Sequence, residues 1–467
     1  MTRASLPVFL LCTLPLAADW PRFRGPNGSG VSETAGLPAQ FGPAKNVVWK
    51  SALPPGHSSP ILSGERIFVT AFEGEKLYTF CLSRDSGKIL WRRECPRARR
   101  ERLDSRNSPA SPTPVADGRH VYVFFPDYGL LSYDFEGVER WRTPLGPFNN
   151  LYGMGASPVL AGDRVVLVCD QSSQSFAAAY DAKTGRLAWK TARPEALSGH
   201  STPIVYQPRE GPAQILAPGS FRMDVYSAAT GAIVWQAEGL ASEMKSVPVL
   251  NGETVYVSGF NTPENDPGRQ VTILPFEEVL AKHDADGDGR ISLKESPDER
   301  TRKYFPYIDL DHDGYMDASE WKLYAASSAA ENGLLAFKIG GGDPVWKYQK
   351  AIPQLPSALL YRGVLYMIND AGVLTTLDPG AGSPHKQARL RGVADRYFAS
   401  PVAGDGKVFI VSHSGVATVL KAGPEQEILA VNELDEECYA TPAIDGGRIY
   451  VRTRSALYCF GLAGAKP

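Results

Sequence analysis

The sequence predicts an all-β fold, an eight-bladed β-propeller closed into a ring by an N-terminal strand, with a small α-helical insert in blade five. Three observations point to it. A unit made of a small residue with proline, two apolar strands, a glycine turn and a tryptophan recurs along the chain. A closing half-unit without an opening stands near the N-terminus. Residues 263–332 interrupt one unit with helical instead of alternating patterning.

The openings of the units are short dipeptides, each followed by an apolar run such as residues 407–411. They stand at Ser59-Pro60, Ser111-Pro112, Ser157-Pro158, Thr202-Pro203, Val247-Pro248, Ser400-Pro401 and Thr441-Pro442, with a weaker eighth at Ser357-Ala358. The ends carry a glycine turn and a tryptophan, most clearly in residues 179–189, and looser copies end at Trp91, Trp141, Trp235 and Trp346.

The ends of the chain complement each other. The last unit, from Thr441, stops before its fourth strand, while residues 47–50 have the closing pattern with no opening before them. We therefore expect strand 47–50 to complete blade eight, which removes two exposed sheet edges. The propeller then spans 19–262 and 333–467, and 263–332 is an insert in blade five.

A family resemblance rests on two motifs. Residues 179–189 read A-x-D-x-x-T-G-x-x-x-W, and residues 20–30 read W-P-R-F-R-G-P-N-G-S-G. The first resembles the tryptophan-docking repeat of quinoprotein-type propellers, and the second resembles the N-terminal signature of many secreted bacterial members. The resemblance implies packing of each tryptophan against the neighbouring blade. It implies little about function, because this fold hosts both enzymes and scaffolds.

The insert holds two twelve-residue loops, 284–295 and 309–320, that match the EF-hand pattern at every specified position. Calcium takes six to eight hard oxygens, which carboxylates at alternate positions, one backbone carbonyl and a final glutamate supply around a turn at glycine. The sequence predicts two Ca²⁺ sites with the ligands Asp284, Asp286, Asp288, Arg290, Ser292 and Glu295, and Asp309, Asp311, Asp313, Tyr315, Asp317 and Glu320.

The two loops are expected to share one core. Only residues 296–308 separate them, so the helices between them must be short. We expect Ile291 to pair with Met316 in a short two-stranded link, over a core formed by Phe276, Val279, Leu280, Phe305, Ile308 and Trp321. A rigid scaffold around the loops favours a structural site over a switch.

A second candidate site follows from the resembled fold, in which the loops between blades and the insert lie on one face. The segments before the openings carry His57, Arg106, Asn107, Met154, His200, Lys245, Arg396, Tyr397 and Tyr439. One hypothesis is a polar pocket where His57, His200 and Lys245 contact an anionic ligand. Ordinary loop polarity is the simpler interpretation.

Two functions remain open. The favoured one is a non-enzymatic binding or scaffold module with a protein or small-molecule partner on the insert face, similar to the propeller lipoprotein of outer-membrane β-barrel assembly. The alternative is a dehydrogenase dependent on pyrroloquinoline quinone, a cofactor the sequence does not favour. No two cysteines are adjacent, and no C-x-x-C-H haem motif occurs.

The N-terminal residues and the net charge of the chain indicate where the protein acts and which partners it lacks. Residues 1–18 have the charged start, short apolar run and small residues of a secretory signal, so we expect an exported, periplasmic or extracellular protein. No later stretch is long enough to span a membrane. A net charge of -2 argues against nucleic-acid binding, and we expect a monomer. The remaining cysteines look like scattered core residues.

Overall fold

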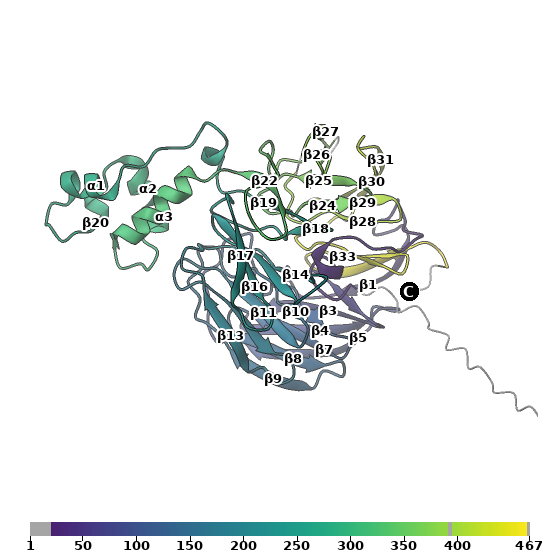
Figure 1. Ribbon diagram of the computed structural model, residues 1–467. Helices are drawn as coiled ribbons and strands as arrows, with labels where there is room; N and C mark the ends of the chain where they lie inside the picture. Colours follow the sequence, from purple (N-terminus) through teal and green to yellow (C-terminus); the bar gives the residue numbers. More distant parts are fainter. Residues whose placement is uncertain (1–19, 391–394, 465–467) are drawn as a thin grey trace, which may run out of the picture.

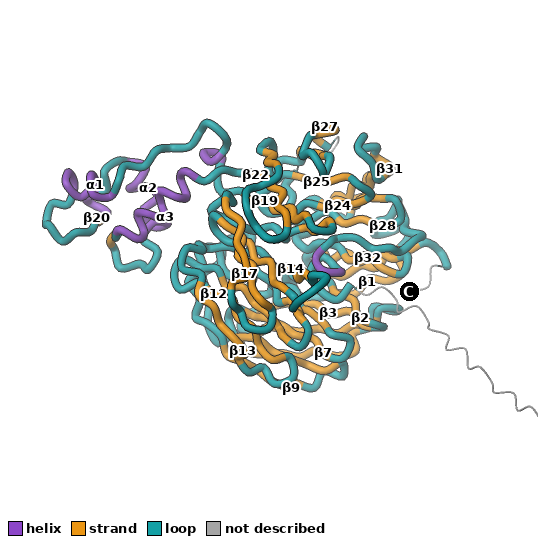
Figure 2. The backbone as a smooth tube through the Cα atoms, in the orientation of Figure 1, coloured by secondary structure: helices purple, strands orange, loops and turns teal. Residues whose placement is uncertain are grey.

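The computed structural model describes residues 20–390 and 395–464; the leader expected at 1–18 lies outside these ranges. Eight four-stranded antiparallel sheets form the propeller, and a lobe with three α-helices projects from it (Figures 1 and 2). The predicted fold class is confirmed. None of the described helices is long and apolar enough to cross a membrane.

The first four blades follow one another in sequence, each running from an inner to an outer strand. They contain β2 (Ile61–Ser63), β3 (Arg66–Glu73), β4 (Lys76–Ser83) and β5 (Ile89–Pro96); β6 (Val115–Ala116), β7 (His120–Phe125), β8 (Gly129–Asp134) and β9 (Glu139–Pro144); β10 (Val159–Ala161), β11 (Arg164–Cys169), β12 (Phe176–Asp181) and β13 (Leu187–Ala192); and β14 (Ile204–Tyr206), β15 (Gln214–Pro218), β16 (Arg222–Ser227) and β17 (Ile233–Glu238).

The last four blades include the interrupted one and the closed one. They contain β18 (Val249–Asn251), β19 (Thr254–Gly259), β22 (Gly333–Lys338) and β23 (Trp346–Tyr348); β24 (Leu359–Tyr361), β25 (Val364–Ile368), β26 (Val373–Leu377) and β27 (Pro384–Arg389); β28 (Val402–Gly404), β29 (Lys407–Val411), β30 (Val416–Lys421) and β31 (Ile428–Glu433); and β32 (Ala443–Asp445), β33 (Arg448–Arg452), β34 (Ala456–Gly461) and β1 (Val47–Ala52).

The closing strand lies where the sequence places it. In blade eight, β1 pairs antiparallel with β34, with Trp49 opposite Cys459 and Ala52 opposite Ala456. The strand extends two residues beyond the predicted 47–50. Closure of the ring by the N-terminal strand is thus confirmed, and the fourth strand of blade eight is made from the other end of the chain.

A chain of hydrogen bonds around the axis explains the small polar residue of the openings. The backbone N–H of one opening donates to the hydroxyl of the next, at 2.9–3.0 Å, in the steps Ser59 to Thr113 to Ser157 to Thr202, and Val247 to Ser357 to Ser400 to Thr441 to Ser59. Val247 has no hydroxyl, so the step into blade five lacks this acceptor. In blade two the residue that takes part in this chain of hydrogen bonds is Thr113. The opening of blade two therefore lies two residues after the expected Ser111.

Five tryptophans dock their blade onto the next, whereas Trp235 donates to Gln214 of its own blade at 3.0 Å. Trp141 of blade two donates from Nε1 to the carbonyl of Ala182 in blade three at 2.9 Å, and Trp49, Trp91, Trp189 and Trp346 repeat this contact. A Cβ on Gly185 would lie 2.4 Å from the Trp141 ring, and Gly185 has a φ of 70°. The turn therefore needs glycine for both its conformation and its space.

The segment before β1 contacts several blades of the ring. Trp20, 1% exposed, bridges to Leu62 of blade one, and the short helix η1 (Pro26–Gly28) follows. Arg22 donates to the carbonyl of Pro203 in blade four, and Arg24 donates to Ala358 in blade six, both at 2.7 Å. These residues therefore connect blades that are not neighbours.

The insert leaves blade five after β19 and returns at β22. It comprises η2 (Pro263–Asn265), α1 (Phe276–His283), β20 (Ile291–Ser292), η3 (Leu293–Glu295), α2 (Glu299–Ile308), β21 (Tyr315–Met316) and α3 (Ala318–Ala329). Its core contains all six expected residues, although Leu280 is only partly buried. Ile291 pairs with Met316, as expected from the spacing of the loops. The insert therefore has a core of its own.

Candidate functional site

The first acidic loop begins at Asp284, directly after α1. Oxygens of Asp284, Asp286 and Glu295 lie within 4.8 Å of one another. Backbone N–H groups inside the loop hold these carboxylates: Gly289 donates to Asp284 at 3.0 Å, and Ala285 donates to Glu295 at 3.0 Å. Hydrogen bonds from the Ser292 side chain and backbone lower the pKa of Glu295 to about 2. The loop therefore presents ionised, converging oxygens.

The second loop repeats this arrangement after α2. Oxygens of Asp309, Asp311 and Asp313 lie within 4.8 Å of one another, and Gly314 donates to Asp309 at 3.0 Å. Glu320 stands outside this triad, and its carboxylate accepts hydrogen bonds from loop backbone groups, among them Leu310 N–H at 2.7 Å. Converging carboxylates are the ligands that Ca²⁺ prefers.

The other predicted ligands take supporting positions. The glycine at the sixth position has a φ of 79° in loop one and 90° in loop two, as the sharp turn requires. Asp288 pairs with the guanidinium of Arg290, which also reaches Asp313 of loop two at 3.1 Å. Asp317 caps α3 by accepting from Ser319 and Glu320 N–H groups. Arg290 thus joins the two loops directly.

The predicted residues of the propeller mouth line a cavity of about 320 Å³ at the axis. The structure brings His57, His200 and Lys245 to its wall, and adds Arg106, Asn107 and Tyr439 from the same expected set. Three members of that set, Met154, Arg396 and Tyr397, do not line the cavity, and Arg396 is exposed. Met154 and Tyr397 are both 0% exposed and belong to the cores between blades.

An aromatic stack forms one side of this axial cavity. The rings of His57 and Tyr439 lie parallel with centroids 3.9 Å apart, and Phe398 stacks on Tyr439 at 5.3 Å. His413 meets the Tyr439 ring edge-on at 4.6 Å. All three stacked rings line the cavity, so it has a flat aromatic wall.

The charges of the axial cavity are balanced within it. Burial lowers the pKa of both His57 and His200 to about 3, so both imidazoles are neutral near pH 7. Lys245 pairs with Glu243 at 2.5 Å, and Arg106 pairs with Asp104 at 2.7 Å. None of these four side chains, His57, His200, Lys245 and Arg106, is therefore an unpaired cation. The sequence-based hypothesis of an anionic ligand in this cavity stays a prediction.

A larger cavity of about 580 Å³ lies between the insert and the propeller. Tyr152 stands on its propeller side, and Tyr304 and Tyr307 of α2 stand on its insert side. The two lobes are joined beside it, where Asn149 donates from Nδ2 to the carbonyl of Leu310 in loop two at 2.8 Å. Sequence reasoning missed this cavity, although tyrosines that precede the core positions Phe305 and Ile308 are a signal.

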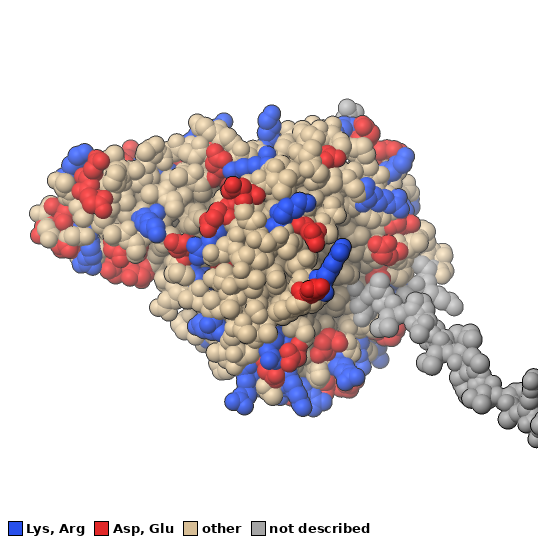
Figure 3. All heavy atoms as spheres, viewed as in Figure 1, with Lys and Arg blue, Asp and Glu red and all other residues tan. Residues whose placement is uncertain are grey.

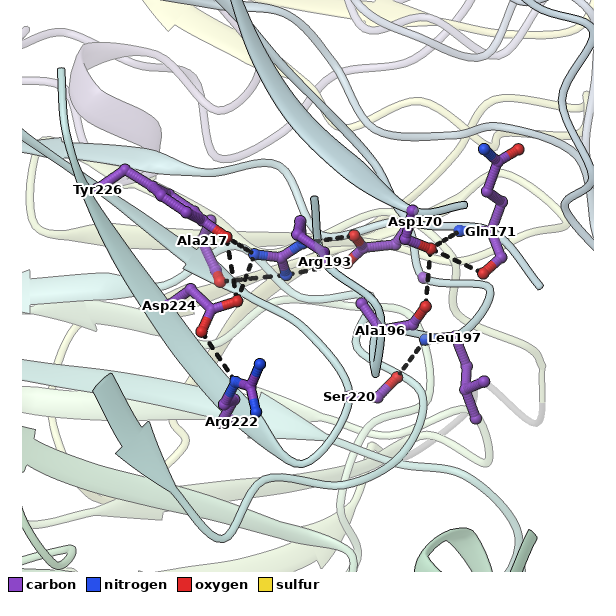
Figure 4. A network of polar contacts seen from close by, with 12 residues as sticks. Asp170, Gln171, Arg193, Ala196, Leu197, Ala217, Ser220, Arg222, Asp224 and Tyr226 are labelled. Atoms are coloured by element: carbon purple, nitrogen blue, oxygen red, sulfur yellow. Dashed lines mark hydrogen bonds and ion pairs between the residues drawn. The ribbon is translucent and has the colours of Figure 1, made fainter. Parts of the chain in front are cut away.

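A buried ion network fixes the propeller side (Figure 4). Arg193, 1% exposed, binds Asp170 of blade three at 2.6 Å and Asp224 of blade four at 2.9 Å. The segment that follows is then fastened to both blades, since Ser175 donates to Ala196 and Leu197 N–H donates to Ser220. This network positions the stretch that leads into both cavities.

A family model described as outer membrane protein assembly factor BamB matches residues 40–143, 80–288 and 286–465, which is nearly all of the chain. The chain belongs to this family. No curated protein matches the sequence.

Solved structures share the fold of this BamB-family chain at low identity. BamB from Moraxella catarrhalis is 11% identical with a TM-score of 0.57, over 90% of this chain and 99% of that one. A europium-containing methanol dehydrogenase is 10% identical, with a TM-score of 0.60 over 95% and 98%. A quinohemoprotein alcohol dehydrogenase from Pseudomonas putida HK5 is 12% identical, with a TM-score of 0.59 over 96% and 81%. The likeness therefore extends to BamB and to dehydrogenases alike, and it shows the fold alone.

The axial cavity does not fit pyrroloquinoline quinone. That quinone carries several carboxylates, and cations free to pair with them would be their strongest partners. Here His57 and His200 are neutral, and Lys245 and Arg106 already pair with carboxylates of the propeller. No adjacent cysteine pair exists in the sequence, and the five described cysteines are free and buried.

The depressed pKa of His200 gives a pH prediction. An unfolded histidine titrates near 6.5, whereas folded His200 titrates at about 3. As pH falls below 6.5 the unfolded chain takes up the proton first, so this contribution to stability is present above pH 6.5 and is lost toward pH 3. When the pH is lowered from 7 to 5, the free energy of unfolding of the parent should fall further than that of His200→Gln. The difference between the two decreases should be up to about 2 kcal/mol. Urea unfolding at both pH values measures it.

The control for this experiment is His385→Gln, which replaces an exposed histidine of β27 by the same residue. It should follow the parent at both pH values. Equal pH dependence of the parent and His200→Gln would contradict a neutral, buried His200.

Proposed function

We propose that this chain is an exported, calcium-binding member of the BamB family that works as a binding or scaffold module and not as an enzyme. The observation that carries the proposal is the convergence of carboxylate oxygens within 4.8 Å in two loops of matching sequence. Each loop takes one Ca²⁺, through the twelve residues named from the sequence. The leader-like residues 1–18 support export.

Calcium at these loops stabilises the insert, and the insert faces the partner. Figure 3 shows acidic side chains gathered at the outer end of the insert, at the left. Residues 263–332 contain 16 acidic and 8 basic side chains, so the insert carries an excess negative charge that bound cations reduce. The partner, a protein or a small molecule, binds on this face. The balanced charges of the axial cavity argue against a quinone dehydrogenase.

Calorimetric titration of the mature chain with calcium tests the proposal. We expect two sites, and a more than tenfold loss of affinity in Glu295→Gln/Glu320→Gln, because each glutamate is the last ligand of its loop. The melting temperature of the propeller should be unchanged, since the insert has its own core.

The matched control is Glu277→Gln/Glu299→Gln, which removes two exposed glutamates of the same insert outside the loops. It should bind calcium like the parent. Absence of calcium binding by the parent would overturn the proposal. Saturable, equimolar binding of pyrroloquinoline quinone, seen in its visible absorbance, would instead favour the dehydrogenase alternative.

A further inference from the structure

The two cavities of the insert face adjoin each other. Asp104, Arg106, Tyr152 and Glu243 line both of them. Together they form one hollow, which we call the inter-lobe cleft, from the aromatic stack at the axis to helix α2 of the insert. The cleft is therefore built by the propeller and the insert jointly, and neither lobe provides it alone.

The size of the cleft suits a small molecule. Its two parts have volumes of about 580 and 320 Å³, and sites for small ligands measure roughly 300–1,000 Å³. A folded protein partner needs a broad surface of about 800 Å² instead. The concave shape favours a ligand that enters the cleft over one that lies across it.

Most charges of the cleft are balanced within it. Three acid–base pairs, Asp104–Arg106, Glu243–Lys245 and Glu264–Arg300, have distances of 2.5–2.8 Å. Of the other charged lining residues, Lys303 lies over the Tyr304 ring at 5.3 Å and Glu320 accepts from backbone N–H groups. A charged ligand would compete with the partner that each of these groups already has. A neutral ligand can accept or donate hydrogen bonds at the pairs and leave them intact.

The remaining lining combines ring faces with hydroxyl groups. Tyr307 is 47% exposed at the insert wall, opposite the stacked rings of the axial wall. Ser242, 1% exposed, lines the larger part, and its Oγ has no hydrogen-bond partner among the described residues. His200 Nδ1 in the smaller part also lacks one within that range. The cleft therefore offers ring faces, and its wall contains buried polar atoms without a partner among the described residues.

These features define the ligand class. A saccharide presents C–H faces to aromatic rings and hydroxyls to side-chain polar groups, whereas peptides are recognised largely through their backbone at a strand edge. We propose that the inter-lobe cleft binds a neutral oligosaccharide and that calcium at loop two holds its outer wall in place. This inference rests on the proposed calcium-binding function and names the partner of that face.

Loop two is attached to the cleft by two contacts. Glu320 lines the larger part, and its carboxylate accepts from Leu310 N–H at 2.7 Å. The carbonyl of the same Leu310 accepts from Asn149 of the propeller at 2.8 Å. Calcium that fixes the loop therefore also fixes the contact between insert and propeller, and ligand binding in the cleft depends on it.

The experiment is calorimetry on the mature chain with three probes, maltohexaose, cellohexaose and chitohexaose, first in calcium and then in EDTA. We expect at least one probe to bind in calcium and to bind at least fivefold more weakly in EDTA. Tyr307→Ala should weaken binding five- to tenfold, because it removes one ring face. Tyr206→Ala, a half-buried tyrosine that lines neither part of the cleft, should bind like the parent.

The outcomes separate the two proposals, because calcium binding is titrated beforehand without saccharide. If calcium binds and none of the three probes does, the cleft inference is overturned while the proposed function stands. Binding that is equal in calcium and EDTA, or equally reduced in Tyr307→Ala and Tyr206→Ala, also overturns the inference. A parent chain that binds no calcium overturns the proposed function itself.

Discussion

Arg193→Leu is expected to lower the free energy of unfolding by about 3–5 kcal/mol, because it leaves the buried Asp170 without its cation and removes one of the two arginines bound to Asp224. Asp170 and Asp224 are each 3% exposed, and Arg193 binds both. Leucine fills part of the space but donates no hydrogen bond. Asp170→Asn added to the variant should recover part of the loss, since it removes one stranded charge. Urea unfolding followed by tryptophan fluorescence measures the change.

The control is Arg454→Leu, the same substitution in an exposed ion pair. The Arg454 side chain is 67% exposed and lies 3.5 Å from Glu437, so we expect a change below about 1 kcal/mol. A loss for Arg193→Leu no greater than that of Arg454→Leu would mean that the network of Figure 4 does not hold blades three and four together.

Deletion of residues 20–52 is expected to leave no folded ring at 25 °C. The segment contributes Trp20, Phe41 and Trp49, which are 1%, 3% and 8% exposed. Truncating one buried aromatic residue costs about 3–5 kcal/mol. The loss of all three is therefore comparable to the whole free energy of unfolding of a typical protein, about 5–15 kcal/mol. Deletion also opens the edge of β34 and removes the arginines that reach blades four and six.

A synthetic peptide of residues 20–52 supplies the matched test. Added in excess to the deleted chain, it should restore a cooperative thermal transition, because β1 pairs through backbone groups that the peptide retains. The same peptide with Trp49→Ala should restore it less well, since it lacks the indole that docks on blade one. A deleted chain that melts like the parent would contradict closure by β1.

Repetition made most of the propeller predictable. Eight openings and a half-unit at residues 47–50 required a closed ring, and the strand pairs as expected. The opening of blade two was misplaced because Ser111-Pro112 and Thr113-Pro114 both fit the pattern in one chain. Only the hydrogen bonds between neighbouring blades select Thr113.

The sites were predictable where their residues are close in sequence. The acidic loops each lie within twelve residues, so spacing alone indicated them. The mouth of the ring depends on side-chain direction, and Met154 and Tyr397 turn into the core although their neighbours face the cavity. The cleft wall at Tyr307 depends on how the insert folds back onto the propeller, which no local pattern specifies.

The pairing of β1 with β34 has a consequence for biosynthesis. Val47 lies opposite Phe460. The strand β1 is therefore synthesised long before β34, the strand with which it pairs. At about 5–20 residues per second, the intervening chain takes on the order of 20–80 s to synthesise. Throughout that time the ring stays open, with the edge of β1 unpaired. The nascent chain therefore completes its fold only after translation, and until then it depends on whatever shields an unpaired strand.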